Sequence, residues 1–195
     1  MRVQTIAAVV LPGVVATAIA VAYFRADRGP TSEEFRVYSA LLKRLASDRH
    51  QQANEVALAT TTLELSDQHY DTWIPAELRS NRTHPPSDFV AFCGWCGRDF
   101  VRKNLAVWRF NPSAAGTLGI SVVEASESSP IPPIKRVVAV TRIGFNVWHN
   151  RAVLSYSADC RDSPEIFAVC VELGQAYLRK KNGSWELDHD DAFWF

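Results

Sequence analysis

The chain has 195 residues, 47% apolar and 22% charged, which is the composition of one globular domain that can bury a core. Its 21 basic residues balance 21 acidic residues and form no dense basic run, so the electrostatic footprint of a nucleic-acid-binding protein is missing. The sequence motifs of nucleotide-binding loops and of the serine-hydrolase nucleophile turn are absent too, and we expect no cofactor.

The first element is an uncharged stretch from Val3 to Phe24 that ends before Arg25. About 20 apolar residues, at roughly 1.5 Å of helix each, are enough to cross the hydrocarbon core of a bilayer. The favoured interpretation is a single transmembrane anchor over residues 1–25, with Phe24 and Arg25 at the interface. The alternative is a signal peptide that is cleaved after Ala20, at a small-x-small site.

Either interpretation takes the rest of the chain out of the cytoplasm, because a short apolar head before a long folded segment is typical of exported proteins. We therefore predict a linker over residues 26–31 and an extracytoplasmic domain over residues 32–195, on the periplasmic side of a bacterial inner membrane. The basic residues that flank the apolar stretch are nearly balanced, so the reverse orientation with a cytoplasmic domain stays open.

The domain begins with a predicted helix. Ser32 can cap this helix, and apolar residues recur at three- and four-residue spacing from Phe35 to Leu45, which indicates one buried face. The pattern fades near residues 48–50. Three further elements are expected in the first half: a strand over residues 55–65, a helical turn over residues 74–78 and a helix over residues 87–103.

The second half of the chain has the pattern of strands. Asn182 and Gly183 stand between two strand-like runs, which is a strong hairpin signal. Strands and helices do not alternate here, so the predicted fold class is α+β, with two or three helices packed on an antiparallel sheet. The expected strands cover residues 105–110, 117–125, 137–145, 152–158, 169–178 and 185–189, with a proline-rich connection over residues 126–133.

Several fragments resemble motifs of a group of uncharacterised bacterial exported or membrane-anchored proteins. Residues 34–42, EFRVYSALL, are similar to the E-[YF]-x-V-Y-S-A-L-L opening of that group, and residues 141–146, TRIGFN, to its S-R-V-G-F-N strand. A strand over residues 152–156 and a hairpin over residues 177–186 follow in the group's order. The resemblance implies an exported α+β domain and no activity. The FCGWCG segment, residues 92–97, has no counterpart in the group.

Four cysteines are the candidates for disulfide bonds: Cys93, Cys96, Cys160 and Cys170. In an exported domain such a set indicates a disulfide framework, and four cysteines allow three pairings. The spacing favours local pairs, because Cys93 and Cys96 are three positions apart and Cys160 and Cys170 flank one loop. Long-range bridges would stabilise the fold more, because they close larger loops.

Cys93 and Cys96 also have the spacing of a redox-active dithiol. A periplasmic thiol–disulfide oxidoreductase that uses this pair is therefore the alternative to a structural disulfide. It would need a buried strand before the motif and a βαβ unit after it, and the sequence predicts neither. A four-cysteine zinc site is disfavoured, because nine residues separate Cys160 from Cys170 where zinc ribbons have two to four.

Two segments mix histidine with carboxylates, residues 67–71 and 188–191, and both are interpreted as solvated polar segments rather than as metal sites. Aromatic residues are the candidates for docking on a partner or on the lipid interface. For the last three residues of the sequence, packing in the core is the favoured interpretation. The docking candidates are Trp148, in a predicted turn, and the last three residues themselves, Phe193, Trp194 and Phe195.

The sequence thus predicts an accessory or interaction protein with no catalytic activity of its own, a small subunit of a larger membrane complex held by one helix. Its predicted partners are the lipid bilayer and at least one protein of that complex. A domain that binds a small apolar ligand is compatible with the α+β order, although no residue specifies such a ligand.

Overall fold

A computed structural model describes residues 29–48, 51–63, 87–104, 106–124, 134–160 and 171–194 of the chain. The uncharged stretch from Val3 to Phe24 and the helical turn expected at residues 74–78 lie outside these ranges, so both stay predictions. Among the described residues, no helix is both long enough and apolar enough to span a membrane.

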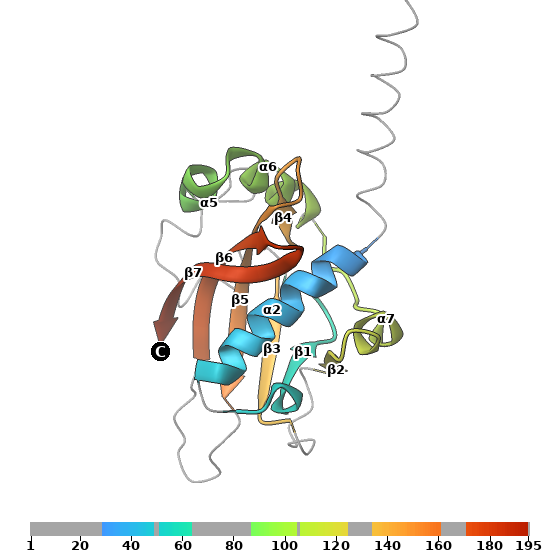
Figure 1. The fold of residues 1–195 in the computed structure, drawn as a ribbon. Helices are drawn as coiled ribbons and strands as arrows, with labels where there is room; N and C mark the ends of the chain where they lie inside the picture. The colour runs from blue at the N-terminus through green and yellow to red at the C-terminus, as the bar shows by residue number, and fades with distance from the viewer. Residues whose placement is uncertain are drawn as a thin grey trace, which may run out of the picture.

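The domain is α+β, and its helices lie against one sheet (Figure 1). α2 runs across the sheet, while α5 and α6 cover the end at which β4 is found. The elements in chain order are α2 (Ser32–Asp48), η2 (Ala53–Glu55), β1 (Val56–Ala59), α5 (Ser87–Phe92), α6 (Gly94–Lys103), α7 (Pro112–Gly116), β2 (Ser121–Val123), β3 (Arg136–Val140), β4 (Gly144–Phe145), β5 (Arg151–Cys160), β6 (Val171–Lys181) and β7 (Ser184–Trp194).

The sheet is mixed, so the prediction of an antiparallel sheet is wrong for its first part. The strand order is β2-β1-β3-β5-β6-β7, and β4 pairs with β5. β1 pairs in parallel with both β2 and β3, with Val56 opposite Arg136, whereas the pairs from β3 to β7 are antiparallel. Parallel pairing needs a long connection, and the chain that contains α5, α6 and α7 supplies it between β1 and β2.

Helix α2 confirms the amphipathic pattern, but Thr31 caps it rather than Ser32. The Glu34 amide donates to Thr31 Oγ1 (3.2 Å) and the Thr31 amide donates to Glu34 Oε2 (2.8 Å), which makes a capping box. The apolar face of α2 enters one core with residues of β1, β3 and β5. The buried apolar residues of this face are Phe35, Val37, Tyr38, Leu41, Leu42, Leu45 and Ala46.

The β6–β7 hairpin confirms the second strong prediction. Asn182 (φ 51°) and Gly183 (φ 84°) both have positive φ, as a two-residue type I′ turn requires. The two strands are longer than predicted, and β7 continues to Trp194. Residues 188–191 therefore lie within a strand and not in a tail, but Asp188, His189 and Asp191 are exposed, as a solvated polar segment requires.

Two predicted elements are interrupted. The helix expected over residues 87–103 breaks at Cys93, whose backbone is extended (φ −165°, ψ 97°) and separates α5 from α6. The strand expected over residues 137–145 forms β3 and β4, with Thr141–Ile143 outside both strands. Both interruptions lie at the end of the domain where Cys93 and Cys96 form a disulfide.

The region after α6 also differs from the prediction. Within residues 106–110 the only strand-type pairing is an isolated bridge between Thr61 and Arg109, so the strand expected there is not formed. The short helix α7 was not predicted. Its cap is Asn111, whose side-chain oxygen accepts from the amides of the first turn, and Pro112 is its first residue.

A buried ion pair joins β3 to β6. Arg136 and Glu172 are 1% and 3% exposed, and the Arg136 guanidinium donates to the Glu172 carboxylate. The Tyr156 hydroxyl donates to Glu172 Oε1 (3.0 Å). Burial, followed by the charges of Glu172 and Asp190, raises the pKa of Tyr156 well above its ordinary value. Because losing one partner would leave a buried charge uncompensated, this group fixes the positions of β3, β5 and β6.

Candidate interaction site at the disulfide end of the domain

The two cysteines of the FCGWCG segment form a disulfide at the junction of α5 and α6. Cys93 and Cys96 are bonded to each other, and their Cα atoms are 5.2 Å apart. Cys93 is the N-cap of α6, and its Sγ accepts a hydrogen bond from the Cys96 amide (3.2 Å). The two residues are 7% and 0% exposed. The bond therefore sets the start of α6 and is almost fully shielded from solvent.

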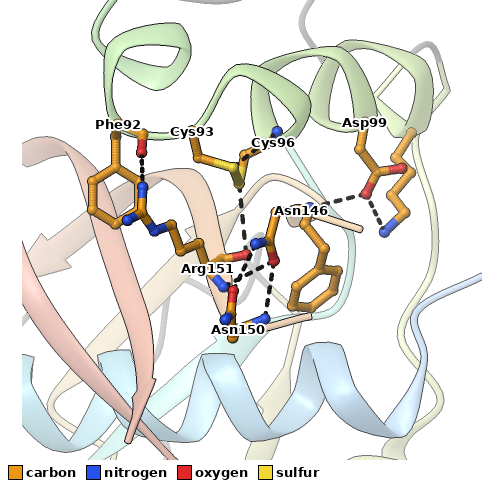
Figure 2. The surroundings of a disulfide bond; sticks show 9 residues. Phe92, Cys93, Cys96, Asp99, Asn146, Asn150 and Arg151 are labelled. Carbon is orange, nitrogen blue, oxygen red and sulfur yellow. Dashed lines mark hydrogen bonds and ion pairs between the residues drawn. A yellow bond between two sulfur atoms is a disulfide. The ribbon is translucent and has the colours of Figure 1, made fainter. Parts of the chain in front are cut away.

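The disulfide packs on the turn end of the hairpin formed by β4 and β5. Cys96 Sγ lies 3.6 Å from the carbonyl oxygen of Arg151, the first residue of β5. The Arg151 guanidinium donates in turn to the Phe92 carbonyl at the end of α5 (2.7 Å). Figure 2 shows the disulfide directly over the turn that holds Asn146 and Asn150. The buried cluster around it also contains Phe89, Phe100, Val153 and Tyr177.

Helix α6 is fastened to β4 by polar contacts and by a close approach of the two backbones. Asp99 Oδ2 accepts from the Phe145 amide (2.9 Å), and Lys103 Nζ donates to the Ile143 carbonyl (3.0 Å). Gly144 lies so close to the helix that an added Cβ would fall 2.1 Å from a main-chain carbonyl oxygen of α6. Any larger residue at this position would push α6 away from β4.

A buried ion pair ties this end of the domain to the residues before α2. Arg142 and Glu34 are 1% and 0% exposed, and Arg142 Nη2 donates to Glu34 Oε2 (3.0 Å) and to the Gly29 carbonyl (2.9 Å). Asn104, the C-cap of α6, accepts from the Arg142 amide (2.6 Å) and donates to its carbonyl (2.9 Å). The start of α2, the end of α6 and the segment between β3 and β4 are therefore held as one unit.

The turn between β4 and β5 is held by its own side chains. Asn146 Oδ1 accepts from the amides of Asn150 (2.9 Å) and Arg151 (3.1 Å), and Asn146 Nδ2 donates to Asn150 Oδ1 (2.6 Å). His149 has positive φ (50°), and its ring stacks on Phe145 with 4.8 Å between centroids. The backbone of the turn is thus specified by local hydrogen bonds and one ring stack.

This rigid turn carries apolar side chains that the domain leaves in solvent. Val147 is 64% exposed and Trp148 is 82% exposed, the most exposed of the large apolar residues described. Trp95, which precedes a disulfide cysteine in α6, is 61% exposed, and the Arg98 guanidinium lies 5.5 Å from its ring centroid. The end of the domain around the disulfide therefore presents two tryptophans and a valine on a fixed frame.

The pKa of Asp99 predicts how the α6–β4 contact responds to acid. Burial alone would raise this pKa, but the charge and hydrogen bond of Lys103, with hydrogen bonds from the Phe145 amide and Arg102, hold it below its usual value. Such a group contributes stability that is present above its unfolded pKa of about 3.9 and is lost as the pH falls through the folded value. In the Asp99→Asn variant, the free energy of unfolding, measured by urea denaturation, should therefore fall less below about pH 4 than it does in the wild-type chain. An unchanged acid dependence in this variant would contradict the assignment.

Removal of the disulfide should weaken the domain without unfolding it. Cys93 and Cys96 close a ring of four residues, and chain entropy assigns so small a ring a contribution of about 2 kcal/mol. We expect the double variant Cys93→Ser/Cys96→Ser to lose about that much free energy of unfolding, measured by urea denaturation. Collapse of the fold in this variant would show instead that the disulfide is the main support of the α5–α6 junction.

The other cysteine candidates lie elsewhere. Cys160 is the last residue of β5, whereas the disulfide packs on the first, so the two are separated by roughly 30 Å of strand. Convergence of all four cysteines on one zinc ion is therefore ruled out. The side chain of Cys160, the whole of Cys170 and the aromatic group Phe193, Trp194 and Phe195 lie outside what the structure describes, apart from the backbone of β7 to Trp194.

The described ranges contain a groove but no evident metal site. Within them, no three or more His, Cys, Asp or Glu side chains are grouped so as to hold a metal ion. Residues 67–71, which mix histidine and aspartate, fall outside the description. A groove of about 390 Å³ lies between α2 and β7, and charged residues such as Lys43, Arg44, Asp188 and Asp190 contribute to its lining. Ala40, Trp185 and Leu187 add apolar surface to this lining, so it is mixed and specifies no class of ligand.

Sequence reasoning identified the disulfide candidates and Trp148, and it missed the residues that hold them in place. Asn146 stands before a turn, which is a usable signal for a side chain that accepts from later amides. No local pattern marks Glu34 or Arg142 as buried, because both stand in segments that read as solvent-facing. The other residues that were missed are Trp95, Asp99, Asn104, Gly144 and Val147.

Comparisons of the chain with models of protein families, with curated proteins and with solved structures found no match. The resemblance of residues 34–42 and 141–146 to exported bacterial proteins therefore stays a prediction.

Proposed function

We propose that this protein is a membrane-anchored accessory protein, a small subunit of a larger membrane complex, whose extracytoplasmic domain acts by binding and not by catalysis. The observation that carries the proposal is the β4–β5 turn, where Val147 and Trp148 are exposed on a backbone held by Asn146. Exposed aromatic side chains on a rigid frame suit binding, because little conformational freedom remains to be lost when a partner covers them.

The packing behind the turn supports a binding role. The disulfide lies against the first residue of β5, directly after the turn, Asp99 accepts from a β4 amide, and Arg142 links the segment before β4 to Gly29 ahead of α2. Such bracing limits the conformations that the turn can adopt. It is what a turn needs when it must keep one shape in order to bind, since pre-organisation lowers the free-energy cost of association.

A thiol–disulfide oxidoreductase is the second candidate, and one observation favours it. Cys93 caps the N-terminus of the ten-residue helix α6, a position that lowers the pKa of a thiol. Against it stand the 7% and 0% exposures of Cys93 and Cys96, because thiol–disulfide exchange requires access to a sulfur atom. Titration of the reduced protein separates the two: a strongly lowered thiol pKa with rapid exchange would favour the enzyme, and slow exchange the structural disulfide.

The proposal is tested on the full chain in its native membrane. A photo-activatable amino acid at position 147 should capture a neighbouring molecule, while the same amino acid at Leu118, an exposed residue after α7, should capture much less. We also expect the chain to remain with membranes after washing at high pH. Recovery of the chain only as a free, soluble monomer would contradict the proposed function.

A further inference from the structure

We infer that the β4–β5 turn rests on the surface of the lipid bilayer, with Val147 and Trp148 at the level of the lipid headgroups. The inference rests on the proposed membrane anchoring and names the partner of that site. Three features of the chain lead to it: the reach of the linker, the position of Gly29 in the domain and the chemistry of the exposed end.

The linker limits how far the domain can lie from the membrane. Phe24, the last residue of the uncharged stretch, and Gly29, the first residue described, are five positions apart. At about 3.6 Å per position, a fully extended chain covers roughly 18 Å between them. An anchor that ends at Phe24 therefore keeps Gly29 within about that distance of the hydrocarbon core, which is roughly two to three times the thickness of one headgroup region.

The position of Gly29 then selects which end of the domain faces the bilayer. Arg142 Nη2 donates to the Gly29 carbonyl, and Arg142 precedes Val147 by only five positions. In Figure 1 the start of α2, β4 and α6 all lie in the upper half of the domain, while η2 lies at the lower end. The turn and the attachment point of the linker are therefore in the same half of the domain, away from η2, and the short linker holds this half towards the membrane.

The exposed end has the residues that a bilayer surface binds. Tryptophan concentrates at membrane interfaces because its ring is apolar and its N–H group is polar, and Trp148 and Trp95 both lie exposed here. Arg98 stands over the Trp95 ring, and Arg151 follows the turn and is exposed. These cations suit the anionic headgroups of a bacterial membrane. Val147 adds the apolar side chain that enters the boundary between headgroups and acyl chains.

The test uses the full chain reconstituted in vesicles of phosphatidylethanolamine and phosphatidylglycerol whose upper acyl chains carry bromine. The emission of Trp148 is obtained as the difference between the wild-type chain and Trp148→Phe, a variant that keeps an apolar ring at an exposed position. We expect brominated lipid to quench most of this difference and aqueous acrylamide to quench little of it. The matched control is the emission of buried Trp185, from Trp185→Phe, which brominated lipid should leave unchanged.

Two failures are distinguishable. If the chain stays in the vesicles but acrylamide, and not brominated lipid, quenches Trp148, the lipid contact is wrong while the proposed anchoring stands. Capture of a protein instead of lipid by a photo-activatable residue at position 148 in native membranes would also overturn the lipid contact, and it would identify the turn as a protein interface. If high-pH washing removes the chain from the vesicles, the proposed function itself is wrong.

Discussion

Replacement of Glu34 by alanine should lower the free energy of unfolding by about 3–5 kcal/mol, the range found when one partner of a buried ion pair is removed. Glu34 is fully buried, and its carboxylate accepts from the Thr31 amide and from Nε and Nη2 of Arg142. Without it, Arg142 keeps a buried charge that lacks its carboxylate partner. Urea denaturation of the full chain, followed by near-ultraviolet circular dichroism, measures the loss.

A matched control separates this effect from the general loss of a surface charge. Glu186→Ala removes a carboxylate that pairs with Lys181 where both side chains are more than half exposed, so we expect a change below about 1 kcal/mol. The double variant Glu34→Leu/Arg142→Met should recover part of the stability, because it removes both charges together. A loss below about 1 kcal/mol for Glu34→Ala would mean that this ion pair does not hold the start of α2 to the segment between β3 and β4.

Among glycine-to-alanine substitutions, Gly144→Ala should be the most damaging, and it should lower the free energy of unfolding by about 3 kcal/mol or more. The added Cβ would meet a backbone oxygen of Cys96 at 2.1 Å and the backbone nitrogen of Phe100 at 2.8 Å, and backbone atoms cannot rotate away as a side chain can. Helix α6 would have to move off β4, taking the disulfide with it. Thermal unfolding measures the loss, and the fluorescence of the exposed tryptophans reports the movement.

Gly94 provides the control for this substitution. It is the first residue of α6, and an added Cβ there would meet no atom within 4 Å. Gly94→Ala should therefore be neutral or slightly stabilising, because alanine favours the helix more than glycine does. Equal stabilities for Gly144→Ala and the wild-type chain would show that α6 does not lie on β4 in solution.

Local elements of the fold can be predicted from the sequence where a short segment has a strong pattern. The buried face of α2 follows from the three- and four-residue spacing of Phe35 to Leu45, and the β6–β7 turn follows from Asn182-Gly183. In both cases one short segment contains the whole signal. Trp148 likewise stands in a turn that the neighbouring strands define.

The rest of the fold depends on contacts between segments far apart in the chain. The parallel pairing of Val56 with Arg136 joins positions 80 apart, and no pattern in either segment specifies the direction of the pair. The break of the helix at Cys93 comes from the disulfide and from packing on β5. Helix propensity depends on the local sequence alone and carries no information about such contacts. The ion pair of Glu34 with Arg142 was missed for the same reason, because it spans 108 positions.

The most direct test of the central claim is the intact mass of the protein isolated from membranes, measured after alkylation of free thiols, with and without prior reduction. Membrane anchoring through residues 1–25 predicts the mass of the complete 195-residue chain, and export predicts that Cys93 and Cys96 take up alkylating reagent only after reduction. A mature form that begins near Val21, or thiols that react without reductant at Cys93 and Cys96, would contradict it.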